Sequence, residues 1–266
     1  MPDERSRDRI QSIERGVEVL RAFGSRREAA LSVADIASRV GLARPVVRRI
    51  LLTFEHIGYA ESVSGIWNLT PRILELGSGY FAASSLPEIS YAYMGDVVER
   101  TGETCSVGVL DGMNVIHVAR LEDHRPLPDS VRIGNSLPAH ATAIGKVLLS
   151  RLSDAELDAV IATAELETHT PRTITDADAL RERIARVRAD GYDVSIEELH
   201  PGQVAAAVPI VVDGRAVGGI AVSSTTVRET ETSLVEEAIP VLREAAAQIA
   251  SAYRNANPQL FRAAAR

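Results

Sequence analysis

Three arginines recur on one side of a predicted helix near the N-terminus. Apolar side chains at helical spacing define one face of residues 43–56, which leaves Arg44, Arg48 and Arg49 on the other. A guanidinium group binds phosphate oxygens, or O6 and N7 of guanine, two at a time, and an α-helix fits the DNA major groove. The spacing therefore predicts a DNA-contacting helix, with Arg44 and Arg48 as the base-reading pair. The alternative is an ordinary solvated helix face.

A shorter helix is predicted immediately before it. Ser32 is placed to cap residues 33–40, whose apolar side chains recur at helical spacing, and Gly41 suits a left-handed stop. Pro45 fits the first turn of the second helix. Two helices joined by a glycine-containing turn form a helix-turn-helix, and its candidate DNA contacts are Ser32, Ala43, Arg44, Pro45, Val46, Arg48 and Arg49.

A hairpin and a third helix are expected to complete this module. Ser64 and Gly65 form a turn signal before an extended run at 66–69, which predicts the hairpin called a wing. Residues 12–23 read as a helix that packs under the other two through Ile13 and Val17, among others. Between Arg26 and Arg49 there are six arginines and two acidic residues, a local charge of +4 in a chain of net charge −7.

The rest of the chain alternates helices and strands. A glycine-containing helix from Pro71 is interpreted as a linker. Beyond it, helices are predicted over 88–101, 142–151, 154–162, 176–189 and 233–253, and strands over 104–110, 114–120, 127–133, 192–198, 205–212 and 216–223. Hairpins outnumber crossover connections, so the sheet should be mostly antiparallel with helices on its faces, an α+β domain.

The segment LPAHATAIGKVLLS, residues 137–150, enters a helix through small residues around Gly145. Open amides at a helix start attract a carboxylate or phosphate, whereas close packing of a helix on a sheet is the structural alternative. The chain's single lysine, Lys146, is expected to lie in solvent, although it could approach an acidic ligand.

No catalytic or metal site is predicted. Glu197, Glu198 and His200 invite such an interpretation, but neighbouring strand residues face opposite ways and the histidines lack metal-ligand spacing. No G-x-S-x-G motif surrounds Ser223, and no phosphate-cradling loop of the P-loop or dinucleotide type is present, so no cofactor is expected.

Composition indicates the cytoplasm. No apolar run is long enough for a membrane helix, the charged N-terminus lacks the apolar core of a secretion signal, and one cysteine, Cys105, cannot form an internal disulfide.

Several segments together resemble the IclR family of bacterial transcriptional regulators, from about Ser12 to Tyr253. They are SIERGVEVLRAF, RRILLTFEHIGYAE, WNLTPRILELG, LPAHATAIGKVLLS and EELHPGQVAAAVPIVVDGRAVGGIAVSS. Within the family, RRILLTFEHIGYAE, LTPRILELGSGY and VIHVAR look most like the subgroup that controls aromatic-acid catabolism through β-ketoadipate, the PcaR, PcaU and PobR type.

The resemblance implies a winged helix-turn-helix over 10–70, a linker helix over 71–85 and a GAF-like effector domain over 86–256. It implies a homodimer, or a dimer of dimers, on a palindromic operator in double-stranded DNA. A small carboxylic acid would act as effector, and the positions implied to bind it are Ala143, Ile144, Gly145, Ser195, Ala205, Ala221 and Ser223.

This sequence departs from family members that bind small keto acids. Ser195 stands where an aspartate can occur, Ala205 where a cysteine can, and Ala221 where a serine can. A less polar, roomier pocket is expected, suited to an aromatic or dicarboxylic acid. The chain is thus expected to be a ligand-responsive regulator of a catabolic operon and not an enzyme. The alternatives are a small-acid hydrolase or transferase with a DNA-binding appendage, and a metal-sensing repressor.

Overall fold

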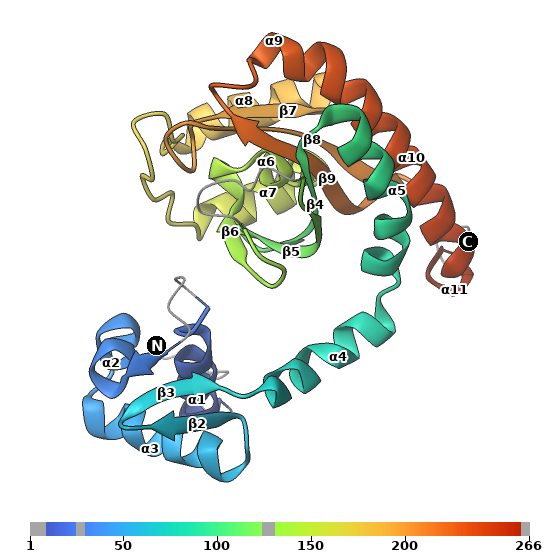
Figure 1. Cartoon of the computed structure of the whole chain (residues 1–266). Coiled ribbons are helices and arrows are strands. Elements are labelled where there is room, and N and C mark those ends of the chain that lie inside the picture. The colour runs from blue at the N-terminus through green and yellow to red at the C-terminus, as the bar shows by residue number, and fades with distance from the viewer. Residues whose placement is uncertain (1–8, 25–29, 124–130, 262–266) are drawn as a thin grey trace. The chain divides into compact units, whose positions relative to one another are not determined.

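The computed structural model describes residues 9–24, 30–123 and 131–261, and the chain divides into two compact units, Met1–Ala83 and Ser84–Arg266 (Figure 1). Among the helices in these described ranges, none has the length and apolar character needed to cross a membrane.

The N-terminal unit is a helix-turn-helix followed by a hairpin. Its elements are α1 (Gln11–Arg21), β1 (Leu31–Ser32), α2 (Val33–Val40), α3 (Arg44–His56), β2 (Ala60–Val63), β3 (Ile66–Leu69), a 3₁₀ turn (Pro71–Ile73) and α4 (Leu74–Ala83). The three strands form an antiparallel sheet in the order β1-β3-β2. The predicted helix-turn-helix and wing are therefore present.

Local interactions set the ends of α2 and the hairpin turn. Ser32 and Asp35 form a reciprocal capping box at the start of α2, and Gly41 ends it at a φ of 64°. Ser64 and Gly65 turn the hairpin at φ values of 52° and 81°.

The core of this unit differs from the prediction at α1. Val19, Ile36, Val47 and Leu51 are fully buried, but Ile13 is 61% exposed and Val17 45% exposed. The buried side of α1 instead runs through Gly16, whose missing side chain lets the Phe54 ring approach closely. The sequence prediction that Ile13 and Val17 pack under the helix-turn-helix was wrong. Ile57, which directly follows the last residue of α3, is also exposed.

The C-terminal unit is an antiparallel sheet with helices on both faces. The strands are β4 (Thr104–Asp111), β5 (Asn114–Leu121), β6 (Ser136–Pro138), β7 (Asp193–Ile196), β8 (Gln203–Val212) and β9 (Arg215–Thr225). The main helices are α5 (Leu86–Thr101), α6 (Ala143–Leu149), α7 (Asp154–Ala162), α8 (Ala177–Asp190) and α10 (Ile239–Ala256), with short helices α9 (Glu231–Ser233) and α11 (Pro258–Phe261). The strand order is β6-β5-β4-β9-β8-β7, so the expected α+β class is confirmed.

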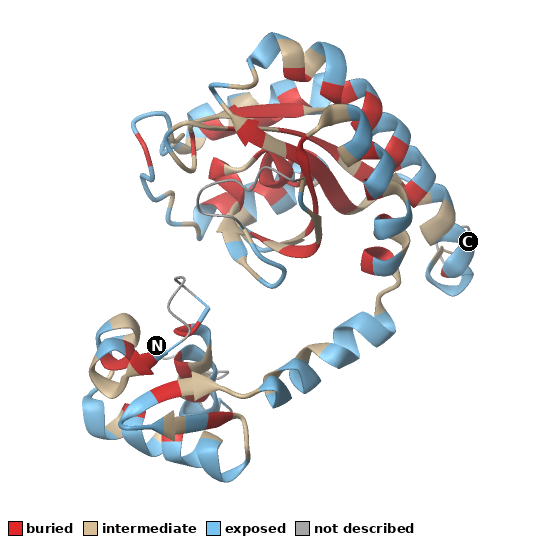
Figure 2. Ribbon diagram, viewed as in Figure 1, coloured by how far each residue is buried: buried red, intermediate tan, exposed pale blue. Residues whose placement is uncertain are grey.

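Two apolar clusters lie on opposite faces of this sheet. Side chains of α5 and α10 pack with Val107, Val208 and Val222 on one face, and those of α6 and α8 pack with Ala207 and Ala221 on the other. Figure 2 shows the buried strands between these helices. The α6 face carries the cavity described below.

Two predicted elements need correction. Residues 131–133 of the strand expected at 127–133 are not extended, the remainder lies outside the described residues, and the edge strand is β6 at Ser136–Pro138. The helix expected over 233–253 contains a π-helical turn at Leu234–Ala238 before α10, which has Pro240 in its first turn. Proline cannot donate a backbone hydrogen bond, so a change of helical geometry at this point is favourable.

Candidate functional site

The outer face of α3 is the candidate DNA surface. Arg44, Arg48 and Arg49 are exposed, whereas Val47 and Leu51 on the opposite side are fully buried. Three fixed positive charges therefore face solvent from one helix, as major-groove binding requires.

The other candidate DNA contacts surround these arginines. Ala43 and Pro45 are exposed at the start of α3, and Val46 is half-buried. The Ser32 hydroxyl is already engaged at the α2 cap, where it donates to Asp35 Oδ2 at 2.6 Å and accepts from the Asp35 amide at 3.2 Å. The hydroxyl hydrogen bond, together with one that the Ser32 backbone amide donates to Asp35 Oδ2 at 3.0 Å, lowers the pKa of Asp35. Ser32 thus has a structural role that the sequence had indicated.

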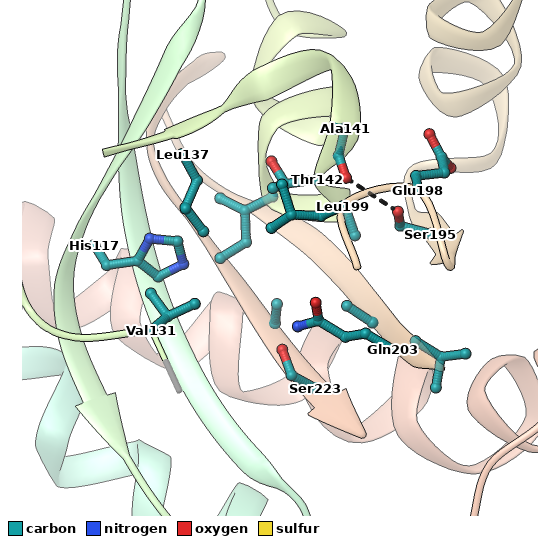
Figure 3. A pocket seen from close by; sticks show the side chains of 15 residues that line it. His117, Val131, Leu137, Ala141, Thr142, Ser195, Glu198, Leu199, Gln203 and Ser223 are labelled. Carbon is teal, nitrogen blue, oxygen red and sulfur yellow. Dashed lines mark hydrogen bonds between the residues drawn. The ribbon is translucent and has the colours of Figure 1, made fainter. Parts of the chain in front are cut away.

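A cavity lies on the α6 face of the C-terminal sheet, between β5, β8, β9 and the start of α6 (Figure 3). Six of the seven expected effector positions line it, although they are spread over 80 residues of sequence. They are Ala143, Ile144, Ser195, Ala205, Ala221 and Ser223. Apolar side chains of Val131, Leu137 and Leu199 complete much of the wall. A mostly apolar concave site with a few polar groups is typical of small-molecule pockets.

Gly145, the seventh expected position, does not line this cavity. A Cβ built on Gly145 would lie 2.2 Å from the Ala139 carbonyl oxygen, so the glycine allows α6 to pack against the 3₁₀ turn at Ala139–Ala141. Thr142 caps α6 by accepting a hydrogen bond from the Gly145 amide at 3.2 Å. Close packing, the structural alternative for this segment, accounts for Gly145.

Ser195 and Ser223 differ in their surroundings. The Ser195 hydroxyl donates to the Ala141 carbonyl at 3.4 Å, as Figure 3 shows. Ser223 lines the cavity from β9, opposite Ala205 in the register of β8 and β9. Ala205 and Ala221 line the cavity beside Ser223, so this part of the wall is apolar.

His117 faces the cavity because it alternates with Val115, which packs on the α6 face of the sheet, and a β-bulge follows it. The register of β4 and β5 shifts at Val107 and Gly108, so that Ser106 pairs with Arg120 and Gly108 pairs with His117. His117 and Arg120, three residues apart, therefore share one face, where regular alternation would separate them. Burial, aided by repulsion from Arg120, lowers the pKa of His117 from 6.5 to about 4, so its ring is neutral at pH 7.

Lys146 was expected in solvent, and this was wrong. Its side chain is completely buried, and its Nζ lies 3.0 Å from Asp193 Oδ2 and 2.5 Å from Glu198 Oε1. Arg183 Nε contacts the other oxygen of Asp193 at 2.7 Å. A buried ammonium group must be paired, and two carboxylates from distant segments provide the pairing.

Glu198 turns inward for a reason that strand alternation did not anticipate. β7 ends at Ile196, and Glu197 adopts a φ of 54°, which redirects the chain. The Thr173 hydroxyl then donates to the Glu198 carbonyl at 2.7 Å and holds the loop. Glu198 consequently lines the cavity while it pairs with Lys146.

Sequence analysis missed four polar residues of the cavity wall: His117, Thr142, Glu198 and Gln203. Three of them carry a buried polar atom that has no hydrogen-bond partner among the described residues, namely His117 Nδ1, Glu198 Oε2 and Gln203 Oε1. Only the acidic pair at 197–198 had drawn attention in the sequence. Nothing in the local pattern around His117 indicates that the sheet face it shares with Val115 carries a cavity.

Family models match both units. The IclR helix-turn-helix domain matches residues 12–64, and the C-terminal domain of bacterial transcriptional regulator IclR matches residues 79–251.

Comparisons with individual proteins indicate the same family as the family models. The chain is 34% identical over 92% of its length to the p-hydroxybenzoate hydroxylase transcriptional activator of Acinetobacter baylyi, covering 92% of that protein. It is also 34% identical to the Pca operon regulatory protein of the same organism, over 92% of this chain and 90% of that one. An IclR homolog from Microbacterium hydrocarbonoxydans, solved in complex with 4-hydroxybenzoate, superposes with a TM-score of 0.75 at 26% identity, over 92% of this chain and 99% of that one. The chain therefore belongs to the IclR family of bacterial transcriptional regulators.

Proposed function

We propose that this chain regulates a catabolic operon by binding a palindromic operator as a homodimer, or a dimer of dimers, in response to an aromatic monocarboxylic acid. The observation that carries the proposal is the cavity lined by six of the seven positions expected to bind an effector. The p-hydroxybenzoate hydroxylase activator of Acinetobacter baylyi and the homolog solved with 4-hydroxybenzoate support the class of acid. The regulator function of these relatives favours this proposal over the hydrolase or transferase alternative.

The carboxylate is assigned to the start of α6. The first amides of a helix have no intrahelical acceptor, and Ala143 and Ile144, the first residues of α6, line the cavity. Ser223 can donate a further hydrogen bond from β9. The aromatic ring would then lie over Ala205 and Ala221, where the keto-acid-binding pattern has polar side chains.

An aromatic monocarboxylate fits this wall better than a dicarboxylate. Among the described residues that line the cavity, none is a lysine or an arginine, and Glu198 contributes an acidic side chain. A second carboxylate would be desolvated without a cationic partner, which is unfavourable.

DNA binding is assigned to Arg44, Arg48 and Arg49 on α3, with Ala43, Pro45 and Val46 close to the DNA backbone or bases. The linker helix at 71–85 would pass the effect of the acid to the winged domains, because coupling requires the effector to prefer one dimer arrangement. The exposed apolar side chains of Leu74, Leu76 and Phe81 on α4 suit a dimer contact.

Calorimetry and DNA binding on the full chain test the proposal. Operator fragments would be selected from random duplexes, and their affinity measured with and without benzoate, hydroxybenzoates, succinate and adipate. We expect an aromatic acid to bind and to change DNA affinity, and Ala205→Leu, which fills the cavity, to abolish both effects. Ala159→Leu on the exposed side of α7 is the matched control. Binding of the aliphatic diacids alone would contradict the proposal.

A further inference from the structure

The exposed face of α3 holds a large apolar side chain, Leu52. It is 38% exposed and follows Arg48 and Arg49 by one helical turn. Val47 and Leu51 on the opposite side of the helix are fully buried, and Leu52 lies outside the apolar cluster that they belong to. Leu52 is therefore part of the surface that carries the arginines and not part of the core.

The charges around Leu52 indicate what this surface contacts. In the described ranges Arg44, Arg48 and Arg49 form no ion pair, whereas Arg72 in the same unit contacts Glu75. Three cations without an internal partner, on one helix face, suit a polyanion such as DNA. This face also belongs to the segment that the IclR helix-turn-helix model matches. The surface around Leu52 is thus continuous with the DNA surface of α3.

A leucine on this surface restricts the base that can lie opposite it. In the major groove, base-pair edges present hydrogen-bond donors and acceptors, and thymine adds an apolar C5-methyl group. A donor or acceptor placed against a leucine side chain loses water without gaining a partner, which is unfavourable. The neighbouring Thr53 hydroxyl already donates to the Arg49 carbonyl at 2.9 Å, so its proton does not compensate for this loss. A thymine methyl group is therefore the complementary partner.

We propose that Leu52 reads the C5-methyl group of a thymine in the operator, close to the base that Arg48 contacts. This inference rests on the proposed function, in which α3 binds the operator, and adds a specificity-determining residue to it. Four residues of helix separate Arg48 from Leu52, about 6 Å along the axis, and successive base pairs are about 3.4 Å apart. The thymine should therefore lie within about two base pairs of the base that Arg48 contacts.

The test replaces the thymines of a selected operator by deoxyuridine, one position at a time in each half-site. This change removes the methyl group and keeps the base-pair hydrogen bonds. Binding of the full chain is measured by fluorescence anisotropy at several salt concentrations. We expect one position at which the replacement weakens wild-type binding about fourfold, the effect of losing one buried methyl-sized group. The ratio should not change with salt, because no phosphate contact is altered.

Variants assign the effect to Leu52. Leu52→Ala should bind the thymine and deoxyuridine operators equally well, because the two changes remove the same contact. Leu260→Ala, at an exposed leucine in the C-terminal unit, is the matched control and should keep the fourfold difference. Arg49→Ala should weaken binding to both operators to the same extent, since a guanidinium group contacts phosphate or guanine and not a methyl group.

The outcomes separate this inference from the proposed function. If the wild-type chain binds a selected operator and no replacement of thymine weakens binding, this inference is wrong while the proposed function stands, and that comparison needs no variant. A methyl preference that persists in Leu52→Ala would overturn the role of Leu52. Failure to select any operator from random duplexes would overturn the proposed function, and this inference with it.

Discussion

Lys146 and Asp193 form an ion pair in which both side chains are completely buried, with Nζ 3.0 Å from Oδ2. The same ammonium group contacts Glu198, whose other carboxylate oxygen has no partner in the described part of the chain, and Glu198 lines the cavity beside α6. The chain's only lysine thus fixes an acidic residue of the cavity wall. Replacing Lys146 by a neutral residue would remove a cationic partner from both Asp193 and Glu198.

Lys146→Met is therefore expected to lower the free energy of unfolding by about 3–5 kcal/mol, the usual effect of removing one partner of a buried pair. Chemical denaturation monitored on the C-terminal unit of the full chain would measure it. Arg100→Met removes a cation that contacts Asp96 and Glu244 at the surface, and should change the free energy of unfolding much less, because solvent screens exposed ion pairs. Equal stability of the two variants would refute a structural role for the buried cluster.

Stability should depend on pH through His117. Its pKa is lowered from 6.5 to about 4 on folding, so the unfolded chain binds more protons between these values. The contribution of neutral His117 to the free energy of unfolding is fully present above pH 6.5. It is lost as the pH falls towards 4, and the free energy of unfolding falls by roughly 3 kcal/mol in total.

His117→Gln, which does not titrate, should therefore lose less stability than the wild-type chain between pH 7 and pH 4. Denaturation at a series of pH values measures the difference, and other groups, such as His140, contribute equally to both proteins. Parallel pH profiles would show that His117 is not buried in its neutral form.

Gly145→Ala should destabilise the C-terminal unit. The added Cβ would lie 2.2 Å from the Ala139 carbonyl oxygen, and backbone atoms cannot move aside without shifting α6. A loss of about 1–3 kcal/mol is expected, the usual effect of overpacking.

Gly95→Ala is the matched control for Gly145→Ala. Gly95 is also helical but exposed, and a Cβ there meets no atom within 4 Å among the described residues. Alanine at this position should stabilise α5 by about 0.5–1 kcal/mol. Melting temperatures that move in the same direction for both variants would contradict the packing argument.

Arg48→Ala should weaken binding to a selected operator by about 1–3 kcal/mol if Arg48 contacts a base. The measurement is fluorescence anisotropy at several salt concentrations, because phosphate contacts alone would reduce affinity equally for all sequences. Arg181→Ala, at a surface arginine in the C-terminal unit, is the control. Unchanged operator affinity in Arg48→Ala would exclude Arg48 from the DNA contact.

The sequence by itself determined the elements whose ends depend on near neighbours. Ser32 and Asp35 cap α2, Gly41 ends it, and Ser64 and Gly65 turn the hairpin through interactions within a few residues. The periodicity of α3 likewise determined which of its faces carries Arg44, Arg48 and Arg49. Such signals are short-range, so a local pattern is sufficient to predict them.

Only the tertiary structure decided the polar wall of the cavity. Lys146 is buried because Asp193 and Glu198, 47 and 52 residues further along the chain, neutralise it. His117 and Arg120 share one face because a bulge in the pairing of β4 and β5 changes the alternation, and Glu198 faces inward because Glu197 adopts a positive φ. These orientations depend on strand pairing between distant segments and on desolvation within the folded unit. Neither can be predicted from the spacing of residues along one segment.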